Sequence, residues 1–332
     1  MSAPKRKQTI KPKLIGKIQD QLPKKSDVRI MGRTSLFDCR PTDMARLHAG
    51  IQLAKDPLGQ EQLGYSTRTL VQANLPHSRP KNPEIWERRN GDFALTIQSD
   101  AYIDPKTGRR ELVGIPYGTV PRLVLFYLCS EAVRTKSREI SLGDNLSDFL
   151  HELGMKNTGG KKGDITRFKQ QMKKLVTAKI KFQYDTDNAE GAINASIAKR
   201  HFFFWDKNPN QTSLFQSQIL LDADFYEEIV ANPVPIHLGA VQALKSSSFG
   251  LDLYTWLTYR VSRLNKPAVI KWSDLQYQIG SDYASTKDFA KRAREVLTQV
   301  KTVWQGLECE TVRGGIRLKP CEPSVPRKRL TG

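Results

Sequence analysis

The stretch STKDFAKRAREVLTQVKTVW, Ser285–Trp304, decides how the rest of the chain is interpreted. At about 100° per residue its apolar side chains share one arc, which predicts a helix with a core-facing side. That side comprises Phe289, Ala293, Val296, Leu297, Val300, Val303 and Trp304. A solvated helix face usually mixes acids with bases, but here Asp288 and Glu295 lie off a stripe of cations. We therefore predict that the stripe binds an anionic partner, through Lys287, Lys291, Arg292, Arg294, Thr298 and Lys301.

The net charge indicates the same kind of partner. The 332 residues include 53 Lys and Arg against 34 Asp and Glu, a formal charge of +19, which favours nucleic acid. Both ends of the chain are cationic. Because polar, Lys- and Pro-rich segments bury too little apolar surface to fold, we expect residues 1–90 to form a basic, largely disordered arm with one short helix near residues 41–54. Residues 321–332 should form a basic tail.

Membrane and secretory classes are not favoured. The longest apolar run, LVLFYLC at Leu123–Cys129, is too short to span a bilayer. The start, MSAPKRKQTIKPK, lacks the apolar segment of a secretory signal. We expect a cytoplasmic protein.

The cysteines show no zinc-ligand spacing and are interpreted as reduced thiols, so no metal and no other cofactor is expected. They are Cys39, Cys129, Cys309 and Cys321.

The predicted elements occur twice in the same order: an apolar helix, a strand, a short helix, a long helix and a β-hairpin. This order is typical of the winged helix-turn-helix, in which the long helix enters a major groove and the hairpin is the wing. We therefore predict an α+β protein with tandem winged helix-turn-helix domains, at residues 91–234 and 235–320. The first domain should open with a β-hairpin around DPKTGRR, whose arms are residues 93–101 and 111–114.

The first copy has a weaker candidate surface than the second. Its long helix, DITRFKQQMKKLVTAKI, should be capped by Asp164 and should carry its polar side chains opposite the core. Gln170 on that side either reads a base edge or is simply solvated. The candidate contacts of this copy are Lys161, Lys162, Arg167, Gln170, Lys173 and Lys174. The wing of the second copy adds Arg313, Arg317 and Lys319.

The first wing should pair residues 179–184 with residues 195–204. Within the run HFFFW, His201–Trp205, alternate side chains can face one core, whereas the others need cover. We expect these other side chains to pack either against the neighbouring copy or against a second chain in a homodimer.

Several runs resemble the plasmid-encoded RepA family of replication initiators, over roughly residues 93–320. They are GIPYGTVPRLVLFYLCSEAVRTKSREISLGDNLSDFLHELGM, GGKKGDITRFKQQMKKLVTAKI, FFFWD and VPIHLGAVQALKSSSFGLDLYTWLTYR. The resemblance implies binding to direct repeats in double-stranded DNA at a plasmid origin, help in opening the duplex, and recruitment of a host replication initiator and the replicative helicase. It also implies that the second copy supplies most repeat recognition, whereas the first contacts the DNA backbone and can form a homodimer that dissociates on DNA.

The sequence also bears on two other functions. A transcriptional repressor would use the same winged helices, so the sequence leaves that alternative open. An origin-nicking enzyme is less favoured, because no His-x-His motif occurs, GMKNTGGKKG does not fit the phosphate-binding pattern GxxxxGK[ST], and DADFYEE is interpreted as a helix start rather than a metal site. We expect a binding protein without catalytic residues.

Overall fold

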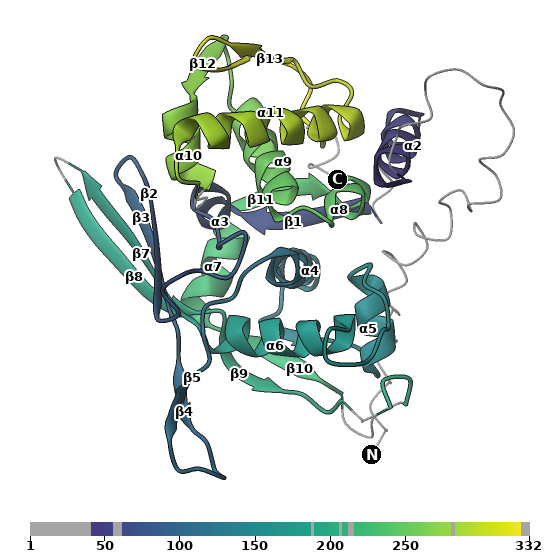
Figure 1. The fold of residues 1–332 in the computed structure, drawn as a ribbon, viewed down its shortest axis with the longest axis vertical. Helices are drawn as coiled ribbons and strands as arrows, with labels where there is room; N and C mark the ends of the chain where they lie inside the picture. Colours follow the sequence, from purple (N-terminus) through teal and green to yellow (C-terminus); the bar gives the residue numbers. More distant parts are fainter. Residues whose placement is uncertain are drawn as a thin grey trace, which may run out of the picture.

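The fold combines helices with small antiparallel sheets, as the computed structural model shows for residues 41–55, 62–186, 189–205, 208–211, 216–279 and 283–326. The predicted disorder over residues 1–40, Cys39 and the last six residues of the predicted tail lie outside these ranges. Two series of elements share one apolar core, with α4 and α9 at its centre (Figure 1). In the described part of the chain, no helix combines the length and apolar character needed to cross a membrane.

Both series follow the predicted order. The first comprises α4 (Thr119–Thr135), β6 (Glu139–Ser141), α5 (Leu146–Glu152), α6 (Asp164–Thr177), β9 (Ala198–Phe202) and β10 (Gln218–Leu221). The second comprises α9 (Ser248–Val261), β12 (Ala268–Lys271), α10 (Trp272–Ile279), α11 (Thr286–Val303), β13 (Cys309–Val312) and β14 (Gly315–Leu318). Their sheets have matching strand orders, β6-β10-β9 and β12-β14-β13, so the last strand is central in each.

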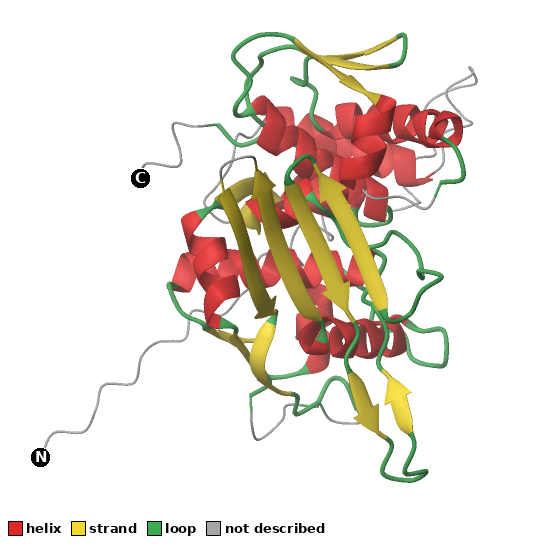
Figure 2. Ribbon diagram, turned by 90° about the vertical axis from the view of Figure 1, so that its left-hand side faces the viewer, coloured by secondary structure: helices red, strands yellow, loops and turns green. Residues whose placement is uncertain are grey.

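The hairpin after α6 pairs differently from the prediction. β7 (Lys179–Thr186) pairs with β8 (Ala189–Ser196) and also with β3 (Phe93–Gln98), which pairs with β2 (Ile85–Asn90). The result is a four-stranded sheet, β2-β3-β7-β8 (Figure 2). The expected pairing of β7 with residues 195–204 is therefore wrong over most of its length, since β9 pairs with β10 instead. The strand nearest in sequence, β8, takes the edge of β7, as short loop closure favours.

Residues 63–90 are folded, which corrects the expected disordered arm over that part. β1 (Leu63–Thr67) pairs with β11 (Pro233–His237), and α3 (Arg68–Gln72) follows it. Trp86 of β2 is buried and donates a hydrogen bond from Nε1 to the Asn74 carbonyl, 3.0 Å away. The apolar side chains of this segment find their partners in distant parts of the chain, which local composition does not reveal.

The expected short helix near residues 41–54 is present as α2 (Pro41–Lys55). It packs against α11 so closely that a Cβ at Gly50 would lie 2.0 Å from the Thr302 carbonyl oxygen. The start of the expected basic tail is also folded: Val325 is buried, and the Ser324 hydroxyl lies 2.7 Å from the Tyr254 hydroxyl.

The hairpin around DPKTGRR is present, although its first arm is divided. β3 ends at Gln98, and a separate strand, β4 (Ala101–Ile103), pairs with β5 (Arg110–Leu112). This two-stranded ribbon projects away from the body of the protein (Figures 1 and 2). Two further helices, α7 (Ala223–Ala231) and α8 (Leu238–Leu244), complete the described elements.

Candidate nucleic-acid interface

The helix α11 forms where its sequence predicts. Ser285 is the N-cap: its hydroxyl accepts a hydrogen bond from the Asp288 backbone N–H at 3.2 Å and donates to the Asp288 carboxylate at 2.7 Å. This satisfies one of the free N–H groups of the first turn. All seven residues of the predicted core side are buried. The polar stripe is therefore held facing solvent by the packing of the opposite side.

The cations of α11 differ in their surroundings. Lys287 and Lys291 are exposed and form no ion pair with another described residue. The Arg294 guanidinium lies 5.3 Å from the centre of the Trp272 ring. Two others have protein partners: Arg292 forms a 2.7 Å ion pair with Glu295, and Lys301 Nζ donates to the Cys309 carbonyl at 2.9 Å. The stripe thus contains both unpaired cations and cations with intramolecular partners.

A basic groove lies between α11, the β12–α10 junction and the β13–β14 turn. Its volume is about 560 Å³, and no acidic residue lines it. Its cations are Lys271, Lys287, Arg294 and Arg313. The exposed side chain of Val269 adds apolar surface, and the buried Trp272 also lines the groove. We call this feature the basic groove.

Sheet register explains why the basic groove exists. In the turn Arg313-Gly314-Gly315, Gly314 has φ +80°, a conformation that favours glycine. A Cβ at Gly315 would lie 2.1 Å from the Ile270 carbonyl oxygen, so only glycine allows β14 to approach β12 this closely. That pairing places Lys271 opposite Gly315. Lys271 was missed from the sequence, because its proximity to Arg313 depends on this register.

Arg317 and Lys319, also predicted as wing contacts, are brought to Glu310 instead of the basic groove. The Arg317 guanidinium lies 3.0 Å and the Lys319 ammonium 3.7 Å from the same Glu310 oxygen. The hydrogen bond from Arg317, together with the charge of Lys319, lowers the pKa of Glu310. The Glu310 carboxylate therefore partly compensates the charges of Arg317 and Lys319, whereas it does not compensate that of Arg313.

In the first series, the residues before α6 form a hydrogen-bonded loop. The N-cap is Gly163, and the prediction that Asp164 caps the helix is wrong. Asp164 is the first helical residue: its carboxylate accepts from the Lys156 backbone N–H at 3.2 Å and pairs with Arg167 at 2.7 Å. This difference follows from the close approach of Gly163 to the Gly159 carbonyl, which excludes a Cβ. Lys161, Lys162 and Gln170 are exposed.

Lys173 and Lys174 have partners that the sequence did not indicate. Lys173 Nζ lies 3.8 Å from the centre of the Tyr102 ring in the ribbon, and Lys174 Nζ lies 4.9 Å from that of Tyr117. Lys174 is half-buried, and burial together with the nearby charge of Arg79 lowers its pKa. Both lysines therefore contact neighbouring segments, Lys173 the ribbon and Lys174 the residues before α4.

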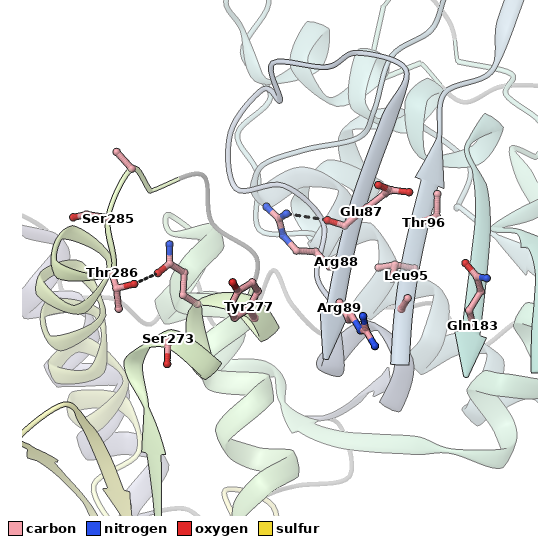
Figure 3. Close-up of a pocket in the computed structure, with 13 residues that line it drawn as sticks. Glu87, Arg88, Arg89, Leu95, Thr96, Gln183, Ser273, Tyr277, Ser285 and Thr286 are labelled. Carbon is pink, nitrogen blue, oxygen red and sulfur yellow. Dashed lines mark hydrogen bonds between the residues drawn. The ribbon is translucent and has the colours of Figure 1, made fainter. Parts of the chain in front are cut away.

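A second groove lies between the four-stranded sheet and the start of α11 (Figure 3). It has a volume of about 670 Å³ and is lined by Arg88, Arg89 and Glu87 from β2 and by Tyr277 from α10. The Thr286 hydroxyl donates to Gln276 Oε1 at 2.9 Å on its far side. Because the carboxylate of Glu87 lines this groove together with the arginines, it is less suited to a polyanion than the basic groove.

The acidic run DADFYEE starts a helix, as the sequence predicted. Asp222 is the N-cap of α7, and its carboxylate accepts from the Asp224 N–H at 3.2 Å. Among the described residues, no three His, Cys, Asp or Glu side chains are grouped to hold a metal ion. The described cysteines are free thiols, and burial raises the pKa of Cys309 to about 11.

Comparison with known proteins supports the resemblance expected from the sequence. Residues 115–274 match the family model described as "Plasmid encoded RepA protein". Two solved structures are similar: the selenomethionine derivatives of domain 2 and domain 3 of RctB, with 13% identity and a TM-score of 0.48 over 76% of this chain and 95% of that chain, and the RctB domains 2-3, with 12% identity and a TM-score of 0.45 over 75% and 96%. No curated protein matches the chain.

Proposed function

We propose that this chain, whose residues 115–274 match the plasmid-encoded RepA family, is a plasmid replication initiator that binds direct repeats of double-stranded DNA at an origin. The basic groove carries the proposal. It brings four cations from three elements together without an acid, beside the exposed side of a well-capped helix. Such a surface suits a DNA backbone, and a helix is the element that fits a major groove.

In this proposal each series is a winged helix-turn-helix. The matching strand orders and the position of α6 and α11 before the last two strands support this assignment. α11 would enter a major groove, and the Arg313-Gly314 turn would follow the backbone as the wing. The first wing is then β9–β10 rather than the hairpin after α6. The domains remain proposed as residues 91–234 and 235–320, with residues 63–90 added to the folded part.

The two series would have unequal roles. The first would contact phosphates through Lys161, Lys162 and Arg167, since Lys173 and Lys174 hold other segments. The second would supply most of the repeat recognition. The chain would act in the cytoplasm, without a cofactor and without an enzymatic step, and would recruit a host replication initiator and the replicative helicase. A homodimer would dissociate to a monomer on DNA.

Binding to a duplex that carries one origin repeat tests this proposal. Fluorescence anisotropy should show tighter binding to the repeat than to a scrambled duplex. Arg294→Ala should cost about 1–3 kcal/mol on the repeat if Arg294 reads a base. Lys287→Ala should weaken binding to both duplexes equally. It should also reduce the salt slope, which is the slope of log K against log salt concentration, by about 0.9. Lys81→Ala, an exposed cation in the loop before β2, is the matched control.

Two further measurements separate this function from its alternatives. Hydroxyl-radical footprinting of the monomer should protect roughly two helical turns without a dyad, because the two proposed reading helices differ in sequence. Supercoiled origin plasmid incubated with the protein and Mg²⁺ should remain un-nicked. The last comparison uses a triple alanine variant of Lys287, Lys291 and Arg294. If it binds the repeat as tightly as wild type does, the basic groove is not part of the DNA interface.

A further inference from the structure

The ribbon formed by β4 and β5 is fixed at its base and is otherwise separate from the other described sheets. Among the described strands, these two pair with each other and with no third strand. At the base, the Val113 N–H donates to the Asp100 carbonyl at 3.0 Å and the Gly114 N–H donates to the Ser99 hydroxyl at 2.7 Å. From that base the ribbon projects away from the rest of the protein, as both views show (Figures 1 and 2). It is therefore an arm that contributes little to the core.

The two faces of the ribbon differ. Residues directly opposite in an antiparallel pair share a face, so Ala101 and Leu112 lie on the same side as Ile103 and Arg110. On this side Ile103 is 70% exposed and Leu112 40% exposed. The other face carries Tyr102, whose ring lies under Lys173 and whose hydroxyl donates to Glu111 at 3.0 Å. One face is thus fastened to the protein, and the other is apolar and open.

The charges of the ribbon are arranged in the same way. Lys106, Arg109 and Arg110 are exposed at and beside the tip and form no ion pair with another described residue. Both acids of the ribbon are engaged: Asp104 accepts from the Lys106 backbone N–H at 2.8 Å, and Glu111 accepts from Tyr102. With three cations and two acids, the ribbon carries a net positive charge.

The direction of the ribbon is set by α6. The Lys173–Tyr102 contact holds one face against the helix, and a Cβ on Gly114 at the base would lie 3.2 Å from Lys174 Nζ. From Ala101 to the tip the ribbon extends by roughly 15–20 Å, at about 3.3 Å per residue. A duplex that lies along the exposed side of α6 would therefore meet the ribbon next to it.

We propose that the ribbon is a second DNA-contacting arm, which lies in the minor groove beside the segment held by α6. Ile103 and Leu112 face the sugars and base edges, and the three cations of the tip bind phosphates on either side of the groove. Apolar side chains combined with Arg and Lys are the means by which proteins bind and widen a minor groove. This inference rests on the proposed function and adds a contact that none of the predicted site residues makes.

The test uses the full chain and a duplex that carries one origin repeat with its flanks. Dimethyl sulphate reports the two grooves separately, because it modifies guanine N7 in the major groove and adenine N3 in the minor groove. Wild type should protect N7 positions within the repeat and N3 positions beside it. The variant K106A/R109A/R110A should lose the N3 protection, keep the N7 protection and show a salt slope shallower by up to about 2.7.

A second variant separates apolar contact from charge. Ile103→Ala should weaken binding without changing the salt slope, since burial of an apolar side chain releases no counterions. The matched controls are K81A/K136A/K266A for charge and Val230→Ala for an exposed apolar side chain.

The outcomes distinguish the two proposals. If wild type protects the repeat but the ribbon variants match it in slope and N3 protection, the ribbon proposal is wrong and the proposed function stands. If the variants lose binding only to single-stranded DNA, the minor-groove assignment is wrong. If wild type protects no duplex, both proposals fail.

Discussion

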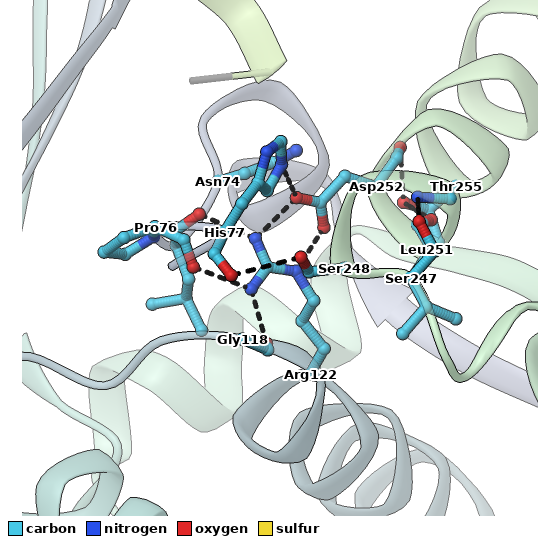
Figure 4. Close-up of polar contacts among 12 residues, drawn as sticks. Asn74, Pro76, His77, Gly118, Arg122, Ser247, Ser248, Leu251, Asp252 and Thr255 are labelled. Carbon is cyan, nitrogen blue, oxygen red and sulfur yellow. Dashed lines mark hydrogen bonds and ion pairs between the residues drawn. The ribbon is translucent and has the colours of Figure 1, made fainter. Parts of the chain in front are cut away.

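Arg122 of α4 and Asp252 of α9 form a buried, two-pronged ion pair that joins the first helices of the two series (Figure 4). Arg122 Nε lies 2.6 Å from Oδ1 and Nη2 lies 2.5 Å from Oδ2. The guanidinium also donates to the carbonyls of Leu75, Pro76 and Gly118. All its donor groups therefore have partners, as a buried guanidinium requires.

The same carboxylate holds the segment that connects α3 to β2. His77 Nε2 lies 2.9 Å from Asp252 Oδ2, and the His77 ring stacks on Phe249 with centroids 5.1 Å apart. Burial lowers the pKa of His77, which favours its neutral form. Burial acts to raise the pKa of Asp252, but the charge of Arg122 and the hydrogen bonds hold it below its usual range. Asp252 therefore stays ionised and keeps the two series in one arrangement.

Breaking this pair should destabilise the protein strongly. Asp252→Ala leaves the Arg122 charge buried without its counter-ion, and we expect a loss of about 3–5 kcal/mol in the free energy of unfolding. Urea unfolding followed by circular dichroism measures it. Glu295→Ala, which removes the exposed pair with Arg292, should cost less than about 1 kcal/mol. Similar losses in both variants would show that the Arg122–Asp252 pair has no special role.

The two arginines of the β13–β14 hairpin should differ in their importance for DNA binding. Arg313 lines the basic groove, whereas Arg317 pairs with Glu310 at 3.0 Å. Arg313→Ala should therefore weaken binding to the origin repeat more than Arg317→Ala does, and should reduce the salt slope by about 0.9. Anisotropy titrations at several salt concentrations compare the two. A larger effect at Arg317 would place the DNA on the exposed face of the sheet.

The homodimer prediction is testable at two side chains of the run His201–Trp205. Phe203 and Trp205 stack at 4.6 Å, and Trp205 contacts Phe168 in the core. Phe202 and Phe204 lie on the other side, 49% and 39% exposed, with rings 6.3 Å apart. We expect F202S/F204S to shift the protein from dimer to monomer in sedimentation velocity without DNA, because two exposed rings form an apolar patch. A wild type that stays monomeric up to submillimolar concentration would contradict the dimer.

Stability should fall as the pH rises toward 8, because of Glu152 at the end of α5. Burial and then the nearby charge of Glu131 raise its pKa from 4.5 to about 8. The folded protein therefore holds this proton where the unfolded chain releases it, so the stability from protonation is complete below pH 4.5 and is lost as the pH rises to about 8. Urea midpoints at several pH values should fall less for Glu152→Gln than for wild type. Glu139→Gln, at an exposed position, should change nothing.

Local patterns in the sequence determined the helices and their order. The 3.6-residue period placed seven core residues of the Ser285–Trp304 stretch correctly and missed the buried Ala290, because a helix face is set by residues close in the chain. The repeated order of elements likewise predicted two similar series of helices and strands, although the first hairpin pairs differently from the prediction. The excess of positive charge indicated the class of partner, since charge is a sum over residues and does not depend on their arrangement.

Contacts between distant segments were decided only by the tertiary structure. Lys271 lines the same groove as Arg313 because β12 pairs with β14 in one register, and Lys173 lies over the Tyr102 ring because the base of the ribbon lies beside α6. Residues 63–90 fold because β1 finds β11, more than 160 positions away in the chain. Strand pairing and side-chain contacts of this kind depend on which surfaces meet in three dimensions, and no local period encodes that choice.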